Sequence, residues 1–223
     1  DENTSAPFAL DVAPDGRVFF TELVRGQIRV YDPKTRNVKT AITLNVYSGG
    51  DDGLLGIVVE SMFAENGWVY VYHTTTQNGT HNRITRYTAA GDFAGPGAPK
   101  VIFDLPALSA ATNHNGGAMH FGNDRKLYVG VGDNARGSPA QDKTSLFGKL
   151  LRLNDDGTIP TDNPFFNQTT GVNRAIWAIG LRNPYTFDVQ PGTGLMYVND
   201  VGEAAWEEIN QGAAGANYGW PNS

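Results

Sequence analysis

The sequence contains no cysteine among its 223 residues, and only three methionines and four histidines. Without cysteine the chain has no disulfide, no thiolate nucleophile, and no zinc–thiolate or iron–sulfur site. The same absence does not distinguish the cytosol from an exported compartment. Chemistry that depends on the thiol group is therefore excluded.

Blocks of lysine or arginine and long apolar runs are missing as well. The formal net charge is −6, and the charged residues are distributed along the chain. Binding to a phosphate backbone or an anionic lipid surface needs clustered positive charge. The longest apolar stretches are far shorter than the roughly 20 residues of a membrane-spanning helix. The sequence predicts no nucleic-acid partner and no membrane span, and it favours a small ligand.

Helical periodicity is also scarce, since no apolar pattern of about 3.6 residues extends over the length of a helix. A short turn over Ala204 to Ile209 is the one candidate. Instead, 27 glycines and 12 prolines are spread through the chain without a collagen period. Such a composition is typical of a turn-rich β protein, so we expect an all-β fold.

Four turns each lead into a strand rich in aromatic and β-branched residues. The turns are Asp15-Gly16, Asn66-Gly67, Asp124-Arg125 and Thr193-Gly194, followed by R-V-F-F-T-E, W-V-Y-V-Y-H, K-L-Y-V-G-V and L-M-Y-V-N-D. A short apolar segment precedes each turn, and further strands follow, for example Lys149 to Leu153. Each unit is therefore predicted to be a small antiparallel meander.

The spacing of these turns favours a β-propeller of four-stranded antiparallel blades over a β-sandwich, which alternating strands also allow. Positions 16, 67, 125 and 194 are separated by 51, 58 and 69 residues, close to or above the roughly 40 to 50 residues of known blade repeats. The increase indicates longer loops toward the C-terminus, where a site would lie. Four units fit either a four-bladed ring or a portion of a larger propeller, and we favour the portion.

His114 is the candidate general base. It lies within T-N-H-N-G-G, residues 112–117. Asn113 and Asn115 can orient an imidazole, and the two glycines permit close approach of a ligand. Histidine can take a proton from a bound alcohol near neutral pH. A hydrogen-bonded structural histidine is the alternative, and most of the four histidines must have that role.

Three further segments carry candidate polar groups. Arg182 and Asn183 precede Pro184, so a guanidinium lies on a fixed turn, where it suits a carboxylate or a developing oxyanion. Residues 199–210 are rich in oxygen ligands, which favour calcium over a transition metal. Asp51 lies in an acidic turn before G-L-L-G. The alternatives are a surface salt bridge for the arginine and solvated loops for the acidic segments.

Eight short motifs follow one another along the chain. They are G-L-L-G-I at 53–57, N-G-W-V-Y-V-Y at 66–72, H-N-G-G at 114–117, L-Y-V-G-V-G-D at 127–133, G-K-L-L-R-L at 148–153, G-L-R-N-P at 180–184, D-V-G-E-A-A-W-E-E-I-N at 200–210 and N-Y-G-W-P at 217–221. In this order the series resembles the glucose/sorbosone dehydrogenase family, soluble sugar dehydrogenases that use pyrroloquinoline quinone (PQQ) and include the aldose sugar dehydrogenases. The match spans nearly the whole chain.

The resemblance implies a six-bladed propeller, of which residues 1–223 would form a single, incomplete domain. It implies PQQ and Ca²⁺ as cofactors, oxidation of an aldose at its anomeric carbon to the lactone, an external electron acceptor, and a secreted or periplasmic location. His114 would take the proton of the anomeric hydroxyl, and Arg182 would polarise the quinone oxygens. Asn183 would lie beside the quinone. We expect these groups and the carbonyls after residue 201 to converge.

The resemblance also implies the calcium ligands. The main-chain oxygens of Gly202 and Glu203 would hold the calcium that binds the quinone. A second, structural calcium would use the carboxylate of Glu208 and the main-chain oxygen of Tyr218.

The chain departs from the family pattern at several points. Asp51 lies where the family usually has Gln or Glu close to quinone and substrate, and its side chain is shorter. Asn113, an expected substrate contact, replaces an Asp of glucose-specific members, which leaves the preferred sugar open. The basic residues that pair with the quinone carboxylates would lie beyond Ser223, so this chain alone is expected to bind PQQ weakly or not at all. The first strand of the first blade would lie before Ser5.

Two other functions are compatible with such a propeller. A non-catalytic binding module of the Hedgehog-interacting type would share the fold and many glycine motifs, but the pair His114 and Arg182 favours the enzyme. A sugar-lactone hydrolase would need ligands from several blades around one axial metal, a pattern that the sequence does not provide.

Overall fold

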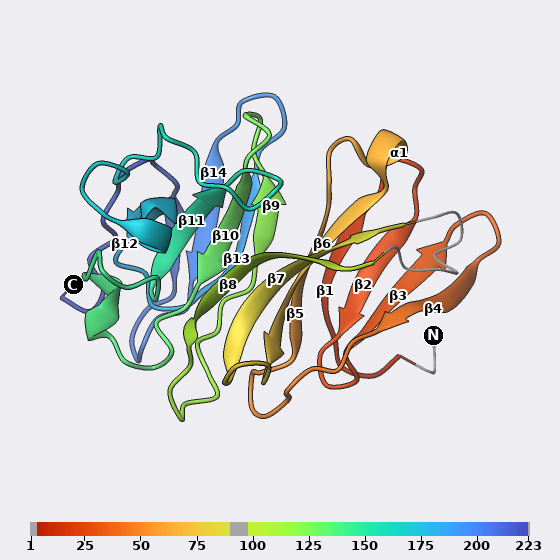
Figure 1. Ribbon diagram of the computed structural model, residues 1–223, viewed down its shortest axis with the longest axis horizontal. Coiled ribbons are helices and arrows are strands. Elements are labelled where there is room, and N and C mark those ends of the chain that lie inside the picture. Colours follow the sequence, from red (N-terminus) through yellow and green to blue (C-terminus); the bar gives the residue numbers. More distant parts are fainter. Residues whose placement is uncertain (1–3, 90–97, 223) are drawn as a thin grey trace. The chain divides into compact units, whose positions relative to one another are not determined.

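The computed structural model describes residues 4–89 and 98–222 (Figure 1). The chain divides into two compact units, residues 1–107 and 108–223. In the first unit the elements are β1 (Pro7–Val12), β2 (Val18–Glu22), β3 (Gln27–Asp32), β4 (Asn37–Thr43), β5 (Leu54–Val59), α1 (Phe63–Asn66), β6 (Trp68–Thr75), β7 (His81–Thr88) and β8 (Lys100–Ala107). None of the helices in the described residues is long and apolar enough to cross a membrane.

The second unit contains seven strands and two short 3₁₀ helices. The strands are β9 (Met119–Phe121), β10 (Leu127–Val131), β11 (Lys149–Leu153), β12 (Ile176–Ile179), β13 (Pro184–Val189), β14 (Met196–Asp200) and β15 (Glu208–Gln211). The 3₁₀ helices are η1 (Ser138–Ala140) and η2 (Gly171–Ala175). The expectation of an all-β fold is therefore confirmed.

Each unit contains two antiparallel meanders, in which every strand pairs with the next one along the chain. The first unit has the sheets β1-β2-β3-β4 and β5-β6-β7-β8. The second has β12-β11-β10-β9 and a three-stranded sheet, β13-β14-β15. The four predicted turns join β1 to β2, β5 through α1 to β6, β9 to β10, and β13 to β14.

Two expectations about the chain's local structure are wrong. The first sheet has four strands, with β1 beginning at Pro7, so its first strand does not lie before Ser5. The segment from Ala204 to Ile209 is not a short helical turn, because Glu208 and Ile209 pair with β14 as part of β15. No alternation of apolar and polar residues marks this strand in the sequence, and its pairing with β14 defines it.

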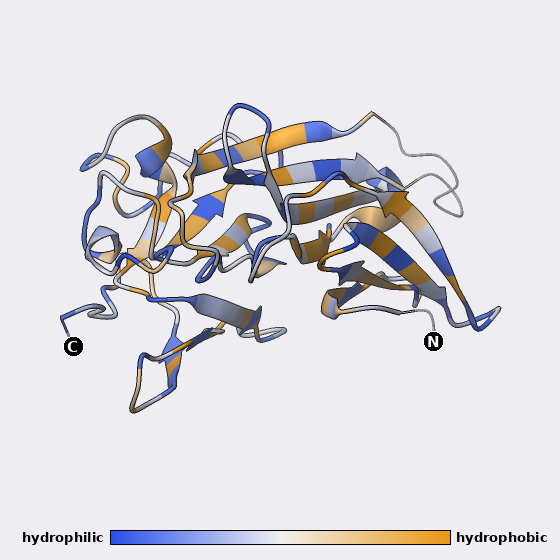
Figure 2. Ribbon diagram, turned by 90° about the horizontal axis from the view of Figure 1, so that it is seen from below, coloured by the Kyte–Doolittle hydropathy of each residue, from blue (hydrophilic) through white to orange (hydrophobic). Residues whose placement is uncertain are grey.

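Hydrophobic and hydrophilic residues alternate along many of the strands (Figure 2). In β14, Met196 and Val198 are buried while Tyr197 between them is exposed, because successive side chains point to opposite faces of a sheet. The strands β5, β10 and β11 are buried along their whole length, as expected where both faces of a sheet are covered.

The predicted functional residues lie in loops at one end of the strands of the second unit. Because the strands are antiparallel, the start of β9, the end of β10, the end of β12 and the start of β13 lie at this same end. His114 precedes β9 and Arg182 lies between β12 and β13. The topology thus brings residues that are 68 positions apart in sequence to neighbouring loops.

Candidate functional site

The His114 imidazole is held by a carboxylate from the end of the adjacent strand. Its Nδ1 lies 2.8 Å from Oδ1 of Asp133, the second residue after β10. A carboxylate accepts, so Nδ1 carries the proton of the neutral ring and Nε2 keeps its lone pair. The imidazole is 13% exposed and the Asp133 side chain 1%. The pair therefore presents an acceptor nitrogen from a largely buried ring.

The main chain of His114 is in the left-handed region, with φ of 58°. Non-glycine residues adopt this conformation rarely, at a cost of about 1 kcal/mol or more. It is maintained by tight packing, because the His114 carbonyl oxygen accepts from Asn134 N at 3.2 Å and lies against the main chain of Gly132. A Cβ at residue 132 would overlap that carbonyl group. Glycine at 132 is required for the loop of His114 to approach β10.

Asp133 accepts four hydrogen bonds. Its Oδ1 accepts from His114 and from Ala135 N at 2.8 Å, and its Oδ2 accepts from Gly137 N at 3.0 Å and Trp220 Nε1 at 2.9 Å. A buried carboxylate with its lone pairs satisfied in this way has one orientation. The orientation of the His114 ring is fixed by the same contacts.

Arg182 lies directly beside this pair. Its carbonyl oxygen accepts from Asp133 N at 2.8 Å, and its Nη1 donates to the carbonyl of Val201 at 3.1 Å. Its Nε is buried and has no hydrogen-bond partner among the described residues. A buried donor without a partner is costly, and it marks a place where an acceptor from a ligand would fit.

Asn183 and Asp200 join the loops that carry these groups. Asn183 is buried, and its Oδ1 accepts from Gly116 N at 3.1 Å, two residues after His114. The carboxylate of Asp200 accepts from the main-chain N–H groups of Arg182 at 2.9 Å and Asn183 at 2.7 Å. Burial raises the pKa of Asp200 to about 6, although these two N–H groups act in the opposite direction.

A buried lysine fixes the loop that follows this site. Lys149 begins β11, and its Nζ donates to the carbonyls of Pro139 at 2.6 Å, Ala140 at 2.9 Å and Phe147 at 2.7 Å. Burial lowers its pKa to about 7. The three carbonyls oppose that effect, since only the ammonium form has three protons to donate. The next main-chain contact, from Gly148 N to the Gly132 carbonyl, ties this loop to the end of β10.

The structure brings the residues proposed for the quinone calcium close to Arg182. Gly202 follows Val201, whose carbonyl accepts from the guanidinium. Within this loop, Gly202 N donates to Glu207 Oε2 at 2.9 Å. Within residues 4–89 and 98–222 no group of three His, Asp or Glu side chains could hold a metal ion. That finding concerns side chains and does not bear on a main-chain site.

The other predicted residues lie at defined positions without a demonstrated common site. Glu208 pairs with Asp200 in the sheet, and its exposed carboxylate accepts from Asn210. The hydroxyl of Tyr218 donates to the Gln211 carbonyl at 2.9 Å. The side chain of Asn113 is exposed beside His114. Asp51 is exposed in a turn of the first unit.

Sequence reasoning missed Asp133 and Trp220 as individual candidates, and it counted Asp200 only among the oxygen ligands of residues 199–210 and not as a partner of Arg182 and Asn183. Each lies in a motif that the resemblance used, at the end of a strand or in N-Y-G-W-P. A polar residue at the end of a buried strand was the available signal for the two aspartates. The indole of Trp220 contacts a residue 87 positions away, and no local pattern predicts such a contact.

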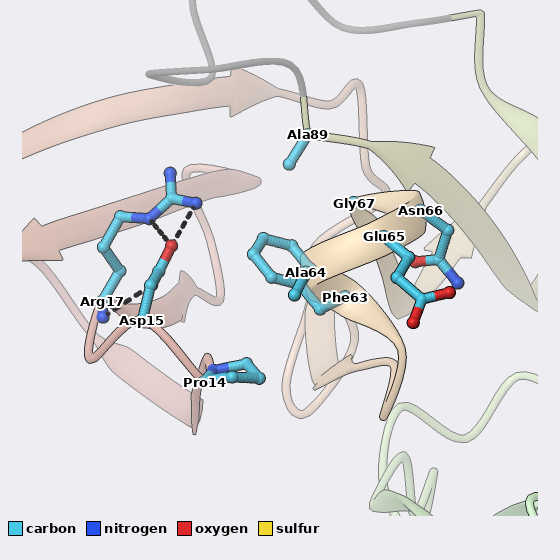
Figure 3. Close-up of a pocket in the computed structure, with 9 residues that line it drawn as sticks. All are labelled: Pro14, Asp15, Arg17, Phe63, Ala64, Glu65, Asn66, Gly67 and Ala89. Atoms are coloured by element: carbon cyan, nitrogen blue, oxygen red, sulfur yellow. Dashed lines mark hydrogen bonds and ion pairs between the residues drawn. The ribbon is translucent and has the colours of Figure 1, made fainter.

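A groove in the first unit, with a volume of about 420 Å³, lies between the turn before β2 and helix α1 (Figure 3). Arg17 makes an ion pair with Asp15 at 2.7 Å there, and its guanidinium carbon lies 5.5 Å from the ring of Phe63. None of the predicted site residues lines this groove.

Comparison with known proteins places this chain in one family. The chain matches the Glucose / Sorbosone dehydrogenase family over residues 4–223. It is 32% identical over 219 residues to the aldose sugar dehydrogenase YliI of Escherichia coli, covering 96% of this chain and 58% of that protein. It is also 32% identical over 249 residues to quinoprotein glucose dehydrogenase B of Acinetobacter calcoaceticus, covering 99% and 51%.

A solved structure extends the comparison to the fold. The PQQ-bound form of the aldose sugar dehydrogenase from Streptomyces coelicolor has a TM-score of 0.88 at 28% identity, covering 99% of this chain and 64% of that chain. The antiparallel meanders are thus the blades of a β-propeller, as the sequence predicted. The chain belongs to the glucose/sorbosone dehydrogenase family. It spans between half and two thirds of the length of these relatives.

Relatives of the Hedgehog-interacting type match less of the chain. The human Hedgehog-interacting protein is 32% identical over 158 residues, which covers 61% of this chain and 22% of that protein. The alternative of a non-catalytic binding propeller therefore has a partial match, whereas the sugar dehydrogenases match throughout.

Proposed function

We propose that the protein is a PQQ- and calcium-dependent sugar dehydrogenase that oxidises an aldose at its anomeric carbon to the lactone and passes the electrons to an external acceptor. The observation that carries the proposal is the His114–Asp133 pair, whose carboxylate also accepts from Trp220, together with the guanidinium of Arg182 at 5.3 Å from the ring of that tryptophan. Two relatives support it by name, one a quinoprotein glucose dehydrogenase and one a PQQ-bound aldose sugar dehydrogenase.

His114 is the general base in this proposal. Its Nε2 takes the proton from the anomeric hydroxyl, which raises electron density at the sugar carbon. Asp133 holds Nδ1–H, keeps the ring in the tautomer with an open Nε2, and stabilises the positive charge that the ring acquires. When bound, PQQ supplies the two-electron acceptor for the hydride that leaves the same carbon.

Arg182 is the proposed electrostatic group. Its Nε has no hydrogen-bond partner among the described residues and its Nη1 donates to the Val201 carbonyl, so an anionic or quinone oxygen would satisfy the remaining donor. A fixed guanidinium would favour the negative charge that hydride transfer delivers. Asn183 would contribute by holding the loop of His114 through Gly116 and by lying beside the quinone. The residues present therefore fit the cofactor.

The remaining parts of the proposal rest on the family resemblance. Gly202 and Glu203 would bind the catalytic calcium through main-chain oxygens, and Glu208 with Tyr218 a structural one. Asp51 would lie near quinone and substrate, and Asn113 near the substrate. We further propose that the chain is a portion of a six-bladed propeller in an exported enzyme, with the remaining cationic partners of the quinone carboxylates in other blades.

The test uses the full-length protein that contains this sequence, loaded with PQQ and Ca²⁺. Reduction of a dye acceptor is followed with a panel of aldoses, and the product is analysed for lactone. Dye reduction that requires both cofactors and yields lactone supports the proposal. Cofactor demonstrably bound, but no aldose turned over, excludes it.

A further inference from the structure

Trp220 is fixed by contacts of its main chain beside β12, an edge strand of the sheet β12-β11-β10-β9. The segment before it pairs in parallel with β12 at Ile179 and Asn217. Trp220 N donates to the Gly180 carbonyl at 3.0 Å, and its own carbonyl accepts from Gln141 Nε2 at 2.6 Å. A side chain at residue 180 would overlap Asn217, so glycine there lets the segment approach. The position of the indole is therefore well defined.

The indole N–H holds the partner of the proposed base. Nε1 donates to Oδ2 of Asp133 at 2.9 Å, on the opposite oxygen from the one that accepts from His114. The two other donors to this carboxylate are main-chain N–H groups. The indole is thus the side chain that fixes the rotation of the carboxylate from the far side.

The face of the same ring holds the proposed electrostatic group. The guanidinium carbon of Arg182 lies 5.3 Å from the Trp220 ring centroid. A cation over an indole face is stabilised by about 0.5 to 2 kcal/mol, depending on its exposure. Because Nε of Arg182 lacks a hydrogen bond among the described residues, this ring contact is a principal restraint on the guanidinium.

We propose that Trp220 is a positioning residue that aligns both groups of the site, His114 through Asp133 and Arg182 through its ring face. The proposal rests on the proposed function. If Trp220 had only a structural role, its substitution would lower the stability of the protein, and activity would fall only as far as the folded fraction falls. A positioning role predicts that the two contacts can be separated by substitution.

Two substitutions separate them. Trp220→Phe keeps an aromatic face for Arg182 and removes the N–H that holds Asp133. Trp220→Leu removes both contacts. Trp68→Phe is the matched control, because it makes the same change at a tryptophan of β6 whose ring also contacts a guanidinium, that of Arg86 at 3.6 Å, and that none of the site contacts described above involves.

The experiment measures full-length variants in two ways. Loaded with PQQ and Ca²⁺, Trp220→Phe should lower kcat roughly 10- to 100-fold with KM within about threefold, as expected for a misaligned base. Trp220→Leu should also weaken PQQ binding measurably, because the guanidinium loses its ring contact and keeps the hydrogen bond to the Val201 carbonyl. Trp68→Phe should keep kcat within about threefold and lower mainly the stability.

In the cofactor-free protein, ¹⁵N NMR of the His114 ring reports its tautomer directly. The wild type should show Nδ1 protonated and Nε2 bare, and Trp220→Phe should shift the population toward the other tautomer. An unchanged His114 spectrum in Trp220→Phe, or a kcat loss in Trp68→Phe equal to that in Trp220→Phe, would overturn the positioning role. The NMR result decides this role even if the wild-type enzyme oxidises no aldose, so the two proposals fail separately.

Discussion

Substitution of Gly132 by alanine is the sharpest structural perturbation of the site. The added Cβ would overlap the carbonyl carbon and oxygen of His114 and lie 3.0 Å from Asn183 Oδ1. Two of these atoms are main chain, so the loop must shift as a body. Such overpacking costs about 1 to 3 kcal/mol of unfolding free energy, and a shift of the base by about 1 Å costs roughly 100-fold in rate.

The assay combines urea unfolding of the full-length protein with dye-linked turnover. Gly132→Ala should lower the free energy of unfolding by about 1 to 3 kcal/mol and kcat by roughly 100-fold. Gly49→Ala is the matched control, since its nearest neighbours are Tyr47 atoms at 3.8 Å or more and its φ is not in the left-handed region. The free energy of unfolding of Gly49→Ala should stay within about 0.5 kcal/mol of the wild-type value. An alanine variant at 132 as stable and active as this control would refute the packing of His114 against β10.

Three further predictions address other parts of the chain. Asp133→Asn should lower kcat roughly 100-fold or more while PQQ still binds, because an amide no longer fixes the tautomer of His114. Turnover near the wild-type value would show that the His114–Asp133 pair has no role in catalysis. Lys149→Met should lower the free energy of urea unfolding by about 2 to 4 kcal/mol, since three buried carbonyls lose their donor. Substitution of the exposed Lys100 by Met should change that free energy by less than about 0.5 kcal/mol, and equal effects of the two substitutions would contradict the role of Lys149. Burial lowers the pKa of His73 to about 4, so as the pH falls the unfolded chain takes up a proton at this histidine before the folded protein does. The free energy of unfolding of the wild type should therefore fall by about 3 kcal/mol more than that of His73→Gln between pH 6.5 and 4, and identical pH profiles would contradict this.

The fold could be predicted from local chemistry wherever a turn and its strands are adjacent in sequence. Asp15-Gly16 supplies a left-handed glycine, and the flanking apolar segments form β1 and β2. At the equivalent turn Arg125 adopts φ of 58° without a glycine, and the strands around it still identify the hairpin. Helix α1 was missed because four residues carry no periodicity. The segment after Ala204 became a strand because pairing with β14 decided its conformation.

The site could be predicted only in part. His114 and Arg182 stand out by residue type, by glycine neighbours and by resemblance to a known family. Their connection through Asp133 depends on the register of β9, β10 and β13, which single-sequence patterns do not determine. The indole contact depends on a segment that returns to β12 after an intervening sheet. Such contacts come from tertiary packing.

The central claim is that Nε2 of His114 removes the proton of the sugar hydroxyl. It is tested most directly by His114→Ala in the full-length protein, with PQQ binding and single-turnover dye reduction measured on the same sample. His120→Gln, at a histidine within β9, is the control. We predict that His114→Ala binds PQQ and loses at least roughly 100-fold in the chemical step, while His120→Gln turns over normally. A His114→Ala enzyme with bound PQQ and an undiminished chemical step would contradict the account.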